Sequence, residues 1–394
     1  MKPLTYGSIC SGVECMSAAS IGLPLKPAFF AEVEPYPCAV LRSKFPHVPN
    51  LGDITKIKYD AATKTLTDGR HTVDLSDGLD ILAGGTPCFV AGTLVLTPSG
   101  YRPIEDLKVG DEVVGGITGE VRRVEAVGSK MAKVGKLKIL GRPEITCTPN
   151  HPFYCIDVKR DTRRKSATYT QMIPQGDYQK VHAEDAVGKY AGRVKLPEAL
   201  TEHETPKVGS LTRAEIMNIA GWYVGDGSIH KWKGKNKKTV ILSLVSKKKI
   251  AKFRSLYDGK VSFYLTSNGH IEIYSTALAN WLIANFGEHA TDKFISHWLY
   301  SDTAKQDFLD GYLATDGCTI GSMRKFVSVS PRLAYGIADL VGNGAMSIRR
   351  LPPKGFIKGV EVNQHDAYIV QGHERSNKTK LINGRYASLI TVSP

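Results

Sequence analysis

The residues best suited to covalent chemistry are a cysteine and, sixty residues later, a threonine and a histidine. Cys88 begins the segment CFVAGTLVLTPSGYRPIEDLKVGDEVVG, in which apolar and polar residues alternate, and Thr148 and His151 lie in EITCTPNHPFYC. A thiolate can attack the carbonyl group that precedes it, while a hydroxyl and an imidazole polarise the scissile amide and protonate its nitrogen. The arrangement predicts acyl transfer at the peptide bond before Cys88. The alternative is that His151 is an ordinary turn histidine before a proline.

Two aspartates could do a different chemistry. Asp226 and Asp316 occupy equivalent places, each before a glycine, in the similar segments LTRAEIMNIAGWYVGDGSI and DTAKQDFLDGYLATDGCTI and lie 90 positions apart. Both segments are expected to be helical, and a glycine five residues before each aspartate, Gly221 or Gly311, would let two helices pack closely. Side-by-side carboxylates could share Mg²⁺, and paired metal ions suit phosphodiester cleavage. The plainer interpretation is two buried helices that end at glycines.

The elements of the first segment suit the binding of a small ligand. Strands are expected at PLTYGSIC, PAFFAEVE and LDILAGG, with a turn at SGVE and a helix of small residues at CMSAAS. Alternating strands and helices predict an open α/β sheet. In such a sheet a ligand lies at the carboxyl ends of the strands, often with an acidic residue on a ribose.

Composition and charge limit the classes of protein. The 394 residues are 42% hydrophobic and 23% charged, which suits several folded domains. No apolar stretch is long enough for a membrane helix, the start of the chain lacks a signal-peptide core, and seven cysteines without a CxxC pair argue against structural zinc. Residues 1–87 carry a net charge of −1 and residues 88–394 carry +15. A nucleic-acid-binding surface is therefore expected beyond residue 87, unless the excess is only a solvated basic surface.

Four motifs of the first segment, YGSICSG, AEVEPYP, GDIT and DILAGGTPC, resemble the opening motifs of cytosine-5 DNA methyltransferases. The resemblance implies a partial, Rossmann-like α/β sheet that binds S-adenosylmethionine through the loop Ser8–Gly12. Glu32 would hold the ribose hydroxyls and Asp53 the adenine amino group, and Asp80 would complete the cofactor-binding residues. Cys88 would be the thiolate that attacks C6 of a flipped cytosine. Later motifs of the family are not found after Cys88, so this chain by itself is expected to be inactive in methylation.

The segment that begins at Cys88 closely resembles the start of an intein, a self-excising element with the all-β Hedgehog/intein (HINT) fold. By that resemblance Cys88 is the N-terminal splicing nucleophile, and Thr148 and His151 assist the N-to-S acyl shift at the preceding bond. FIKGVEVNQHDAYIVQG, residues 356–372, resembles the penultimate intein block, in which two strands return to the splicing centre. The asparagine that cyclises would be Asn377, although the residues on either side of it depart from the family pattern.

The repeat around the two aspartates resembles single-chain LAGLIDADG homing endonucleases, which have an α+β fold with a pseudo-twofold repeat. The resemblance implies that Asp226 and Asp316 are catalytic and bind Mg²⁺, and that Lys293, in ATDKFISHWL, belongs to the catalytic centre. KWKGKNKKTVILSLVSKKK predicts strands with a basic face that contacts double-stranded DNA. The expected DNA-binding residues are Lys231, Lys233, Lys235, Lys237, Lys238, Lys247, Lys248 and Lys249.

These resemblances divide the chain into five parts. They are a methyltransferase segment (1–87), a first splicing part (88–205), an endonuclease (206–350), a second splicing part (351–377) and a tail without an assigned role (378–394).

The sequence therefore predicts a methyltransferase precursor that splices or cleaves itself and cuts DNA at a specific site. One alternative is an endonuclease with a degenerate, non-splicing intein, and another is a non-enzymatic fragment that binds S-adenosylmethionine. A monomer in the cytoplasm of a prokaryotic or phage-infected cell is expected, with no membrane partner. A downstream methyltransferase piece is a further expected partner.

Overall fold

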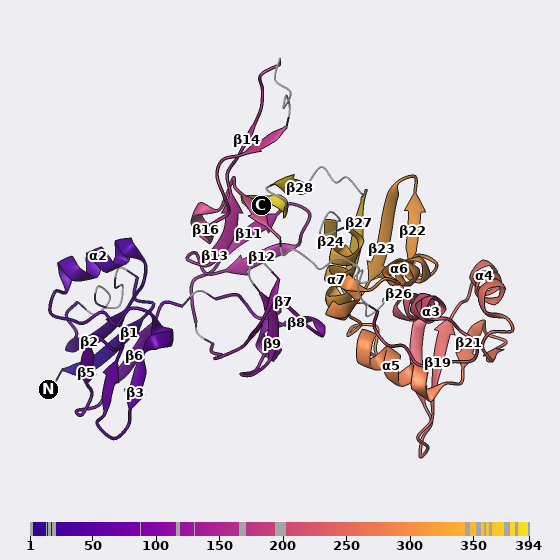
Figure 1. The fold of residues 1–394 in the computed structure, drawn as a ribbon, viewed down its shortest axis with the longest axis horizontal. Helices are drawn as coiled ribbons and strands as arrows, with labels where there is room; N and C mark the ends of the chain where they lie inside the picture. The colour runs from indigo at the N-terminus through magenta and orange to yellow at the C-terminus, as the bar shows by residue number, and fades with distance from the viewer. Residues whose placement is uncertain are drawn as a thin grey trace. The chain divides into compact units, whose positions relative to one another are not determined.

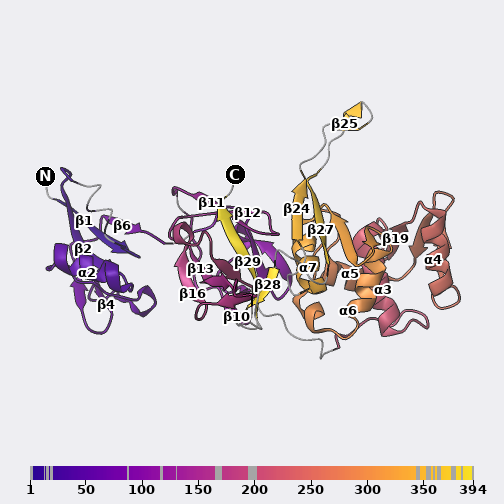
Figure 2. The same cartoon turned by 90° about the horizontal axis from the view of Figure 1, so that it is seen from above.

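In the computed structural model the chain divides into two units, residues 1–88 and residues 89–394 (Figures 1 and 2). No helix among the described residues is long and apolar enough to cross a membrane. The structure describes the chain apart from residues 1–2, 13, 15–16, 18–20, 87, 116–118, 130, 165–170, 194–201, 343–346, 352–355, 358–359, 362–364, 374–378, 383–384 and 393–394.

The first unit is built on three parallel strands in the order β2–β1–β6. They are β1 (Leu4–Ile9), β2 (Leu25–Ala31) and β6 (Ile81–Gly84). The register pairs Ile9 with Ala31 and Gly84, so the three carboxyl ends lie at one edge. Helix α2 (Pro35–Lys44) buries Leu41 against aromatic residues of β1 and β2. The predicted strands are present, and the helix predicted at CMSAAS lies mostly outside the described residues.

A small antiparallel sheet completes the first unit and was not expected from the sequence. It consists of β3 (Lys58–Asp60), β4 (Thr65–Thr67) and β5 (Thr72–Asp74), and follows the 3-10 helix η1 (Ile54–Lys56). Val73 of β5 packs with Phe29 of β2 and with Leu51. The small sheet thereby buries apolar surface of the parallel one.

The β-rich part of the second unit has a seven-stranded sheet along the path β12–β11–β29–β17–β13–β16, with β28 paired to β29. Its strands are β11 (Gly135–Ile139), β12 (Glu144–Cys147), β13 (Pro152–Ile156), β16 (Gln179–His182), β17 (Tyr190–Gly192), β28 (Thr379–Ile382) and β29 (Arg385–Val392). Leu137, Cys147, Cys155, Ala191 and Ile390 form its core. The predicted short antiparallel strands after Cys88 are confirmed.

Three hairpins and two 3-10 helices accompany this sheet. They are β7 (Leu94–Thr97) with β8 (Gly100–Pro103), β9 (Glu112–Gly115) with β10 (Glu120–Arg123), β14 (Val158–Arg160) with β15 (Met172–Pro174), η2 (Ile104–Asp106) and η3 (Ala183–Asp185).

The α+β part of the second unit contains the same arrangement twice. The first copy comprises α3 (Arg213–Asp226), β18 (Gly227–Lys231), β19 (Lys238–Ser243), α4 (Lys247–Tyr257), β20 (Phe263–Leu265), β21 (His270–Ile273) and α5 (Thr276–Phe286). After η4 (His297–Ser301), the second comprises α6 (Lys305–Leu313), β22 (Gly317–Ile320), β23 (Met323–Ser328), α7 (Pro331–Gly342), β24 (Ser347–Leu351) and β27 (Ala367–His373), with the small hairpin β25 (Phe356–Ile357) and β26 (Val360–Glu361) before β27. The sheets run β18–β19–β21–β20 and β22–β23–β27–β24, which is one strand order repeated. The predicted internal repeat is thus present in the fold.

The predicted C-terminal boundaries are wrong. Residues 351–377 were expected to return to the splicing sheet, but β27 pairs with β23 and β24 in the second copy of the α+β part. Residues 378–394, expected to be a tail, supply β28 and β29, and β29 pairs with both β11 and β17 (Figure 2). Alternating apolar residues predict a strand, but its partner depends on distant segments of the chain.

Two glycines let α3 and α6 lie in contact (Figure 1). A Cβ atom at Gly221 would lie 2.1 Å from the carbonyl oxygen of Phe308, and one at Gly311 would lie 2.0 Å from that of Asn218. The Asn218 amide donates a 2.9 Å hydrogen bond to the Asp307 carbonyl across the same interface. Close approach of the helices is therefore what requires the glycines, as the sequence predicted.

Helix α7 joins the two parts of the second unit. Its Asp339 accepts a hydrogen bond from the Tyr101 hydroxyl of β8 and forms a 3.2 Å ion pair with Arg142. Arg332, also on α7, donates to the Tyr101 carbonyl oxygen. Burial, with repulsion from Arg142, lowers the pKa of the adjacent Arg193 to about 9. Asp339 therefore compensates positive charge that folding removes from water.

We expect Gly221→Ala to destabilise the second unit by about 3 kcal/mol, because the added methyl group forces α3 and α6 apart. Urea unfolding measures the change. Gly128→Ala is the control, since a Cβ at Gly128 meets no atom within 4 Å. Equal stability of the two variants would contradict the steric role of Gly221.

Candidate functional site

The two aspartates meet where the paired helices end. Asp226 is the last residue of α3, and Asp316 lies between α6 and β22. Partial burial raises the pKa of Asp316, the negative charge of Asp226 raises it further, and Lys249 opposes the rise. The structure therefore brings both predicted carboxylates into one site. Negative charge at a helix C-terminus is unfavourable, which favours a cation here.

A lysine of the chain faces this site. The Lys249 ammonium donates a 2.6 Å hydrogen bond to Asp226 Oδ2, as half of an ion pair. Lys249 was expected on a DNA-binding strand with Lys247 and Lys248, but all three lie in the first turn of α4. The prediction of strand there is wrong because the apolar alternation of β19 ends before Ser246, the N-cap of α4.

The other predicted DNA-binding lysines fall into two groups. Lys231 forms a 2.8 Å hydrogen bond with the Glu288 carboxylate, and Lys238 forms one of 2.6 Å with the Asn280 side chain. Three more are exposed in the connection between β18 and β19, namely Lys233, Lys235 and Lys237. The exposed lysines of the predicted set that no other side chain is described as pairing thus lie at this turn and, as Lys247 and Lys248, at the start of α4.

The outer faces of the two sheets are more varied than the predicted basic face. Val240, Leu242, Ile271 and Ile273 are buried in the core, so alternate residues of β19 and β21 face the opposite side. By the same alternation around buried Phe326, Ile348 and Val370, the outer face of the second sheet carries three residues that sequence reasoning missed, Lys325, Arg349 and Gln371.

Lys293, predicted to belong to the catalytic centre, is buried, with 1% of its surface exposed. Its ammonium donates to the carbonyl oxygens of Tyr223, at 2.6 Å, and Gly227, at 3.0 Å, and lies 3.2 Å from the centre of the Tyr223 ring. Burial lowers the pKa of Lys293 to about 7, against a smaller opposite effect of Asp292. The two carbonyls flank Asp226 in the sequence. Lys293 therefore supports the end of α3 that carries the aspartate.

Two of the expected splicing residues, Thr148 and His151, lie in a turn near the start of the β-rich part. Phe89, the residue after Cys88, forms an isolated bridge with Cys147, and its ring lies 3.8 Å from the His151 ring between centres. Thr148 is buried, and its carbonyl accepts a 3.0 Å hydrogen bond from the His151 amide. The tight turn between β12 and β13 thus holds Thr148 and His151 beside the residue that follows Cys88.

Burial lowers the pKa of His151, although a hydrogen bond with the Pro152 carbonyl opposes the change. The shift favours the neutral imidazole, which can accept a proton.

The Cys88 thiol donates a 3.4 Å hydrogen bond to the Thr86 carbonyl oxygen.

Asn377, the predicted cyclising residue, lies outside the described residues. It falls in the connection between β27 and β28, before both C-terminal strands of the seven-stranded sheet. A chain cut after Asn377 would separate β29 from β11 and β17, between which it is paired. The strand order therefore argues against Asn377 as the C-terminal splice junction.

The predicted cofactor loop follows β1 at the carboxyl edge of the parallel sheet. Ser8 is buried, and Cys10 and Gly12 have φ angles of 49° and 58°. The Glu32 carboxylate accepts hydrogen bonds from the amides of Gly12, at 2.7 Å, and of Val33 and Glu34, each at 2.8 Å. In this structure Glu32 ties two loops of that edge together.

The other two predicted cofactor residues, Asp53 and Asp80, lie in different parts of the first unit. Asp53 follows the Gly52 turn, and its carboxylate lies 3.9 Å from the Lys56 ammonium. Asp80 precedes β6 and accepts a 2.7 Å hydrogen bond from the Thr5 amide, near the amino end of β1. The prediction that Asp80 binds cofactor is wrong, because parallel strands place it at the edge opposite the Ser8–Gly12 loop.

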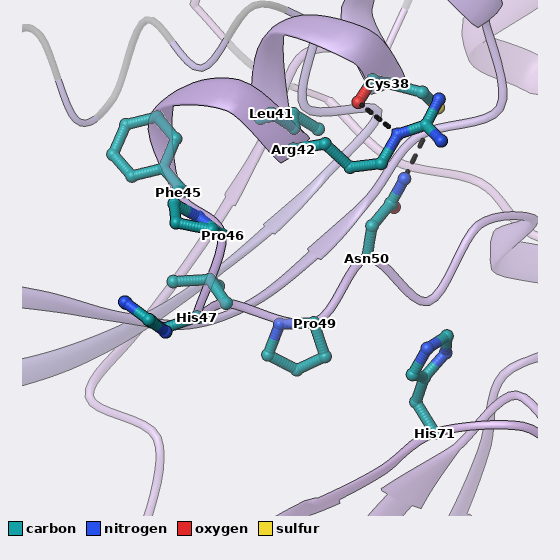
Figure 3. Close-up of a pocket in the computed structure, with 10 residues that line it drawn as sticks. Cys38, Leu41, Arg42, Phe45, Pro46, His47, Pro49, Asn50 and His71 are labelled. Carbon is teal, nitrogen blue, oxygen red and sulfur yellow. Dashed lines mark hydrogen bonds between the residues drawn. The ribbon is translucent and has the colours of Figure 1, made fainter.

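The first unit has a pocket of about 600 Å³ beside α2 (Figure 3). Residues of α2, of the following loop and His71 line it, and Figure 3 shows the Asn50 amide turned toward Cys38. None of the predicted cofactor residues lines this pocket. It is thus separate from the Ser8–Gly12 loop.

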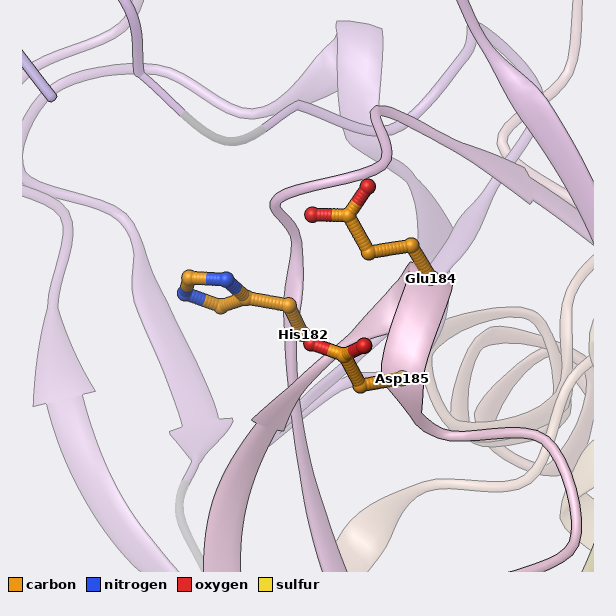
Figure 4. A group of neighbouring side chains, drawn as sticks. All are labelled: His182, Glu184 and Asp185. Carbon is orange, nitrogen blue, oxygen red and sulfur yellow. The ribbon is translucent and has the colours of Figure 1, made fainter. Parts of the chain in front are cut away.

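A cluster of His182, Glu184 and Asp185 was also missed by the sequence analysis (Figure 4). Their possible ligand atoms lie within 4.8 Å of one another, and all three residues are exposed. The Glu184 amide donates a 3.1 Å hydrogen bond to the Pro149 carbonyl, so η3 lies against the turn of Thr148 and His151.

Several known proteins resemble parts of this chain. The sequence model of the Hint domain family matches residues 87–144. The "DNA N-6-adenine-methyltransferase" of Escherichia phage P1 is 48% identical over 88 residues, which are 22% of this chain and 10% of that protein. The chain therefore spans about a tenth of the length of this curated relative.

Two structures of the homing endonuclease I-DmoI are among the similar solved structures. Its mesophilic variants match with a TM-score of 0.28 and 12% identity over 40% of this chain and 87% of theirs. I-DmoI in complex with DNA and Mn matches with a TM-score of 0.27 and 14% identity over 40% of this chain and 88% of that one.

The depressed pKa of Lys293 predicts a pH-dependent stability. Since the folded pKa, about 7, is below the unfolded value, folding favours the neutral amine, and stability rises as pH increases from 7 toward 10. Lys293→Met removes this group, so the variant should lack that part of the rise. Urea unfolding of both proteins at several pH values between about 6 and 9 measures how the free energy of unfolding depends on pH. Parallel curves would show that Lys293 keeps its ordinary pKa.

Proposed function

We propose that this chain is an intein with an embedded homing endonuclease, inserted in a DNA methyltransferase immediately before its catalytic cysteine. The Hint domain match, which begins at residue 87, is the observation that carries the proposal. The contact of Phe89 with His151 supports it, because it holds the predicted acid–base group beside the start of the inserted element.

The proposed splicing chemistry begins with the Cys88 thiol. The sulfur attacks the carbonyl carbon of residue 87, the bond to the Cys88 nitrogen breaks, and that nitrogen takes a proton as the thioester forms. His151 supplies the proton exchange, and Thr148 orders the turn that presents it. An added thiol would then exchange with the thioester and release residues 1–87.

We expect dithiothreitol to release a fragment ending at Pro87, and Cys88→Ala to abolish this release. His151→Ala should slow it about a hundredfold, because general acid–base catalysis is lost. Intact-mass spectrometry of the full chain measures both effects. Cys318→Ala is the control, since Cys318 is an exposed free cysteine far along the chain. Cleavage at the same bond in Cys88→Ala would refute the assignment.

The α+β part supports site-specific DNA cleavage as the second activity. Its two copies share one strand order, and their helices bring Asp226 and Asp316 into one site. Two carboxylates at the ends of helices are oxygen donors of the kind that Mg²⁺ prefers, so these residues fit a divalent cation. The cation would supply Lewis-acid chemistry for hydrolysis of a phosphodiester. Exposed lysines at 233, 235 and 237, with Lys325 and Arg349, would bind the DNA backbone.

We expect Asp226→Asn and Asp316→Asn each to reduce DNA cleavage at least about a thousandfold while DNA binding persists. The substrate is a plasmid carrying the uninterrupted codons for Gly-Gly-Thr-Pro-Cys, assayed with Mg²⁺ and then with EDTA. Asp258→Asn is the control, because Asp258 pairs with Arg254 at an exposed end of α4. Wild-type cleavage by the double asparagine variant would exclude these aspartates.

The methyltransferase part of the proposal concerns residues 1–87. The 48% identity to the phage P1 enzyme supports a DNA methyltransferase, and the name of that enzyme specifies N-6-adenine. The segment DILAGGTP, residues 80–87, instead favours cytosine-5 chemistry, because it resembles the motif that precedes the catalytic cysteine of that family, whose thiolate attacks C6 of the base. S-adenosylmethionine would lie at the carboxyl edge, where a Cβ atom added at Gly12 would meet no atom within 4 Å. Glu32 would hold it through the remaining acceptor capacity of Oε2.

A further inference from the structure

The charge of the aspartate site is already partly neutralised by the chain itself. Asp226 and Asp316 carry like charges at the ends of paired helices, where each helix dipole is also negative. Lys249 is the counter-ion of Asp226, with its ammonium 2.6 Å from Asp226 Oδ2, and its positive charge also lowers the pKa of Asp316. One ammonium group therefore offsets negative charge on both carboxylates.

The position of Lys249 is not explained by its own helix. The first turn of α4 carries Lys247, Lys248 and Lys249 and no acidic residue, although positive charge at a helix N-terminus is unfavourable. Lys247 and Lys248 are exposed, whereas the Lys249 side chain is 30% exposed and that of Asp226 17%. The ion pair with Asp226 offsets the unfavourable interaction of the Lys249 charge with the positive end of the α4 dipole.

A divalent cation on the same carboxylates would lie within a few ångströms of the Lys249 ammonium, and the two positive charges would repel each other. We propose that Lys249 is a resident counter-cation that holds the aspartate site together without metal and leaves Asp226 when a metal ion binds. The inference rests on the metal site of the proposed endonuclease. Lys249 has a flexible four-carbon side chain that is partly exposed, so its ammonium group can move into solvent.

The proposal predicts opposite effects of one substitution on metal affinity and on metal-free stability. Lys249→Gln should bind Mn²⁺ about tenfold more tightly than the wild type, because the metal ion no longer displaces a lysine. The same variant should unfold at a lower temperature in EDTA, because the two carboxylates lose their counter-ion. Saturating Mn²⁺ should restore its stability.

The test is titration of the full chain with Mn²⁺ alone, with free Mn²⁺ followed by electron paramagnetic resonance, together with thermal unfolding in EDTA. Lys248→Gln is the matched control, because it removes the same charge from the exposed residue that directly precedes Lys249. Affinity in Lys249→Gln equal to or weaker than that of the control would overturn the proposal.

Asp226→Asn separates this failure from that of the proposed function. If the wild type binds Mn²⁺ and Asp226→Asn does not, the metal site exists and the Lys249 comparison decides the inference. If Asp226→Asn binds Mn²⁺ as well as the wild type does, the proposed metal site is wrong and the role of Lys249 falls with it.

Discussion

The contact between α3 and α6 at Gly221 and Gly311 is the constraint on which the α+β part depends. A Cβ atom added at either glycine would lie about 2 Å from a backbone atom of the other helix. There is no room for a side chain, and the two helices are in contact through their backbones. Each helix leads directly into its own sheet, and the close contact brings the two copies together at the helix ends. Asp226 and Asp316 meet there as a consequence of steric fit.

That steric fit creates an electrostatic problem, which other elements relieve. Two carboxylates and two helix C-termini concentrate negative potential at one place. Lys249 reaches Asp226 from α4, and Lys293 reaches the carbonyls on either side of it from the segment before α6. The two lysines differ in burial: Lys293 is enclosed, whereas Lys249 is partly exposed, which is why we propose exchange with a metal ion only for Lys249.

The seven-stranded sheet and the α+β part are interleaved along the chain. Strand β29 comes after the entire α+β part and is paired between β11 and β17, which precede it. The Asp339 contacts with Tyr101 and Arg142 add a second connection, through α7. An insertion of this kind is compatible with both folds, because β17 before it and the hairpin β28–β29 after it belong to one sheet, in which β29 pairs with β17.

The sequence by itself determined the local elements and the chemistry that they carry. Alternation after Cys88, the Thr148–His151 turn, the repeated helices with their glycines and the three parallel strands follow from local residue patterns. Tertiary structure decided the partners: which sheet takes residues 367–373 and 385–392, and which edge holds Asp80. It also decided that Lys249 meets Asp226 and that Lys293 is buried. The reason is physical, because strand pairing and ion pairing join segments far apart in sequence, and local periodicity contains no information about which distant segment will be the neighbour.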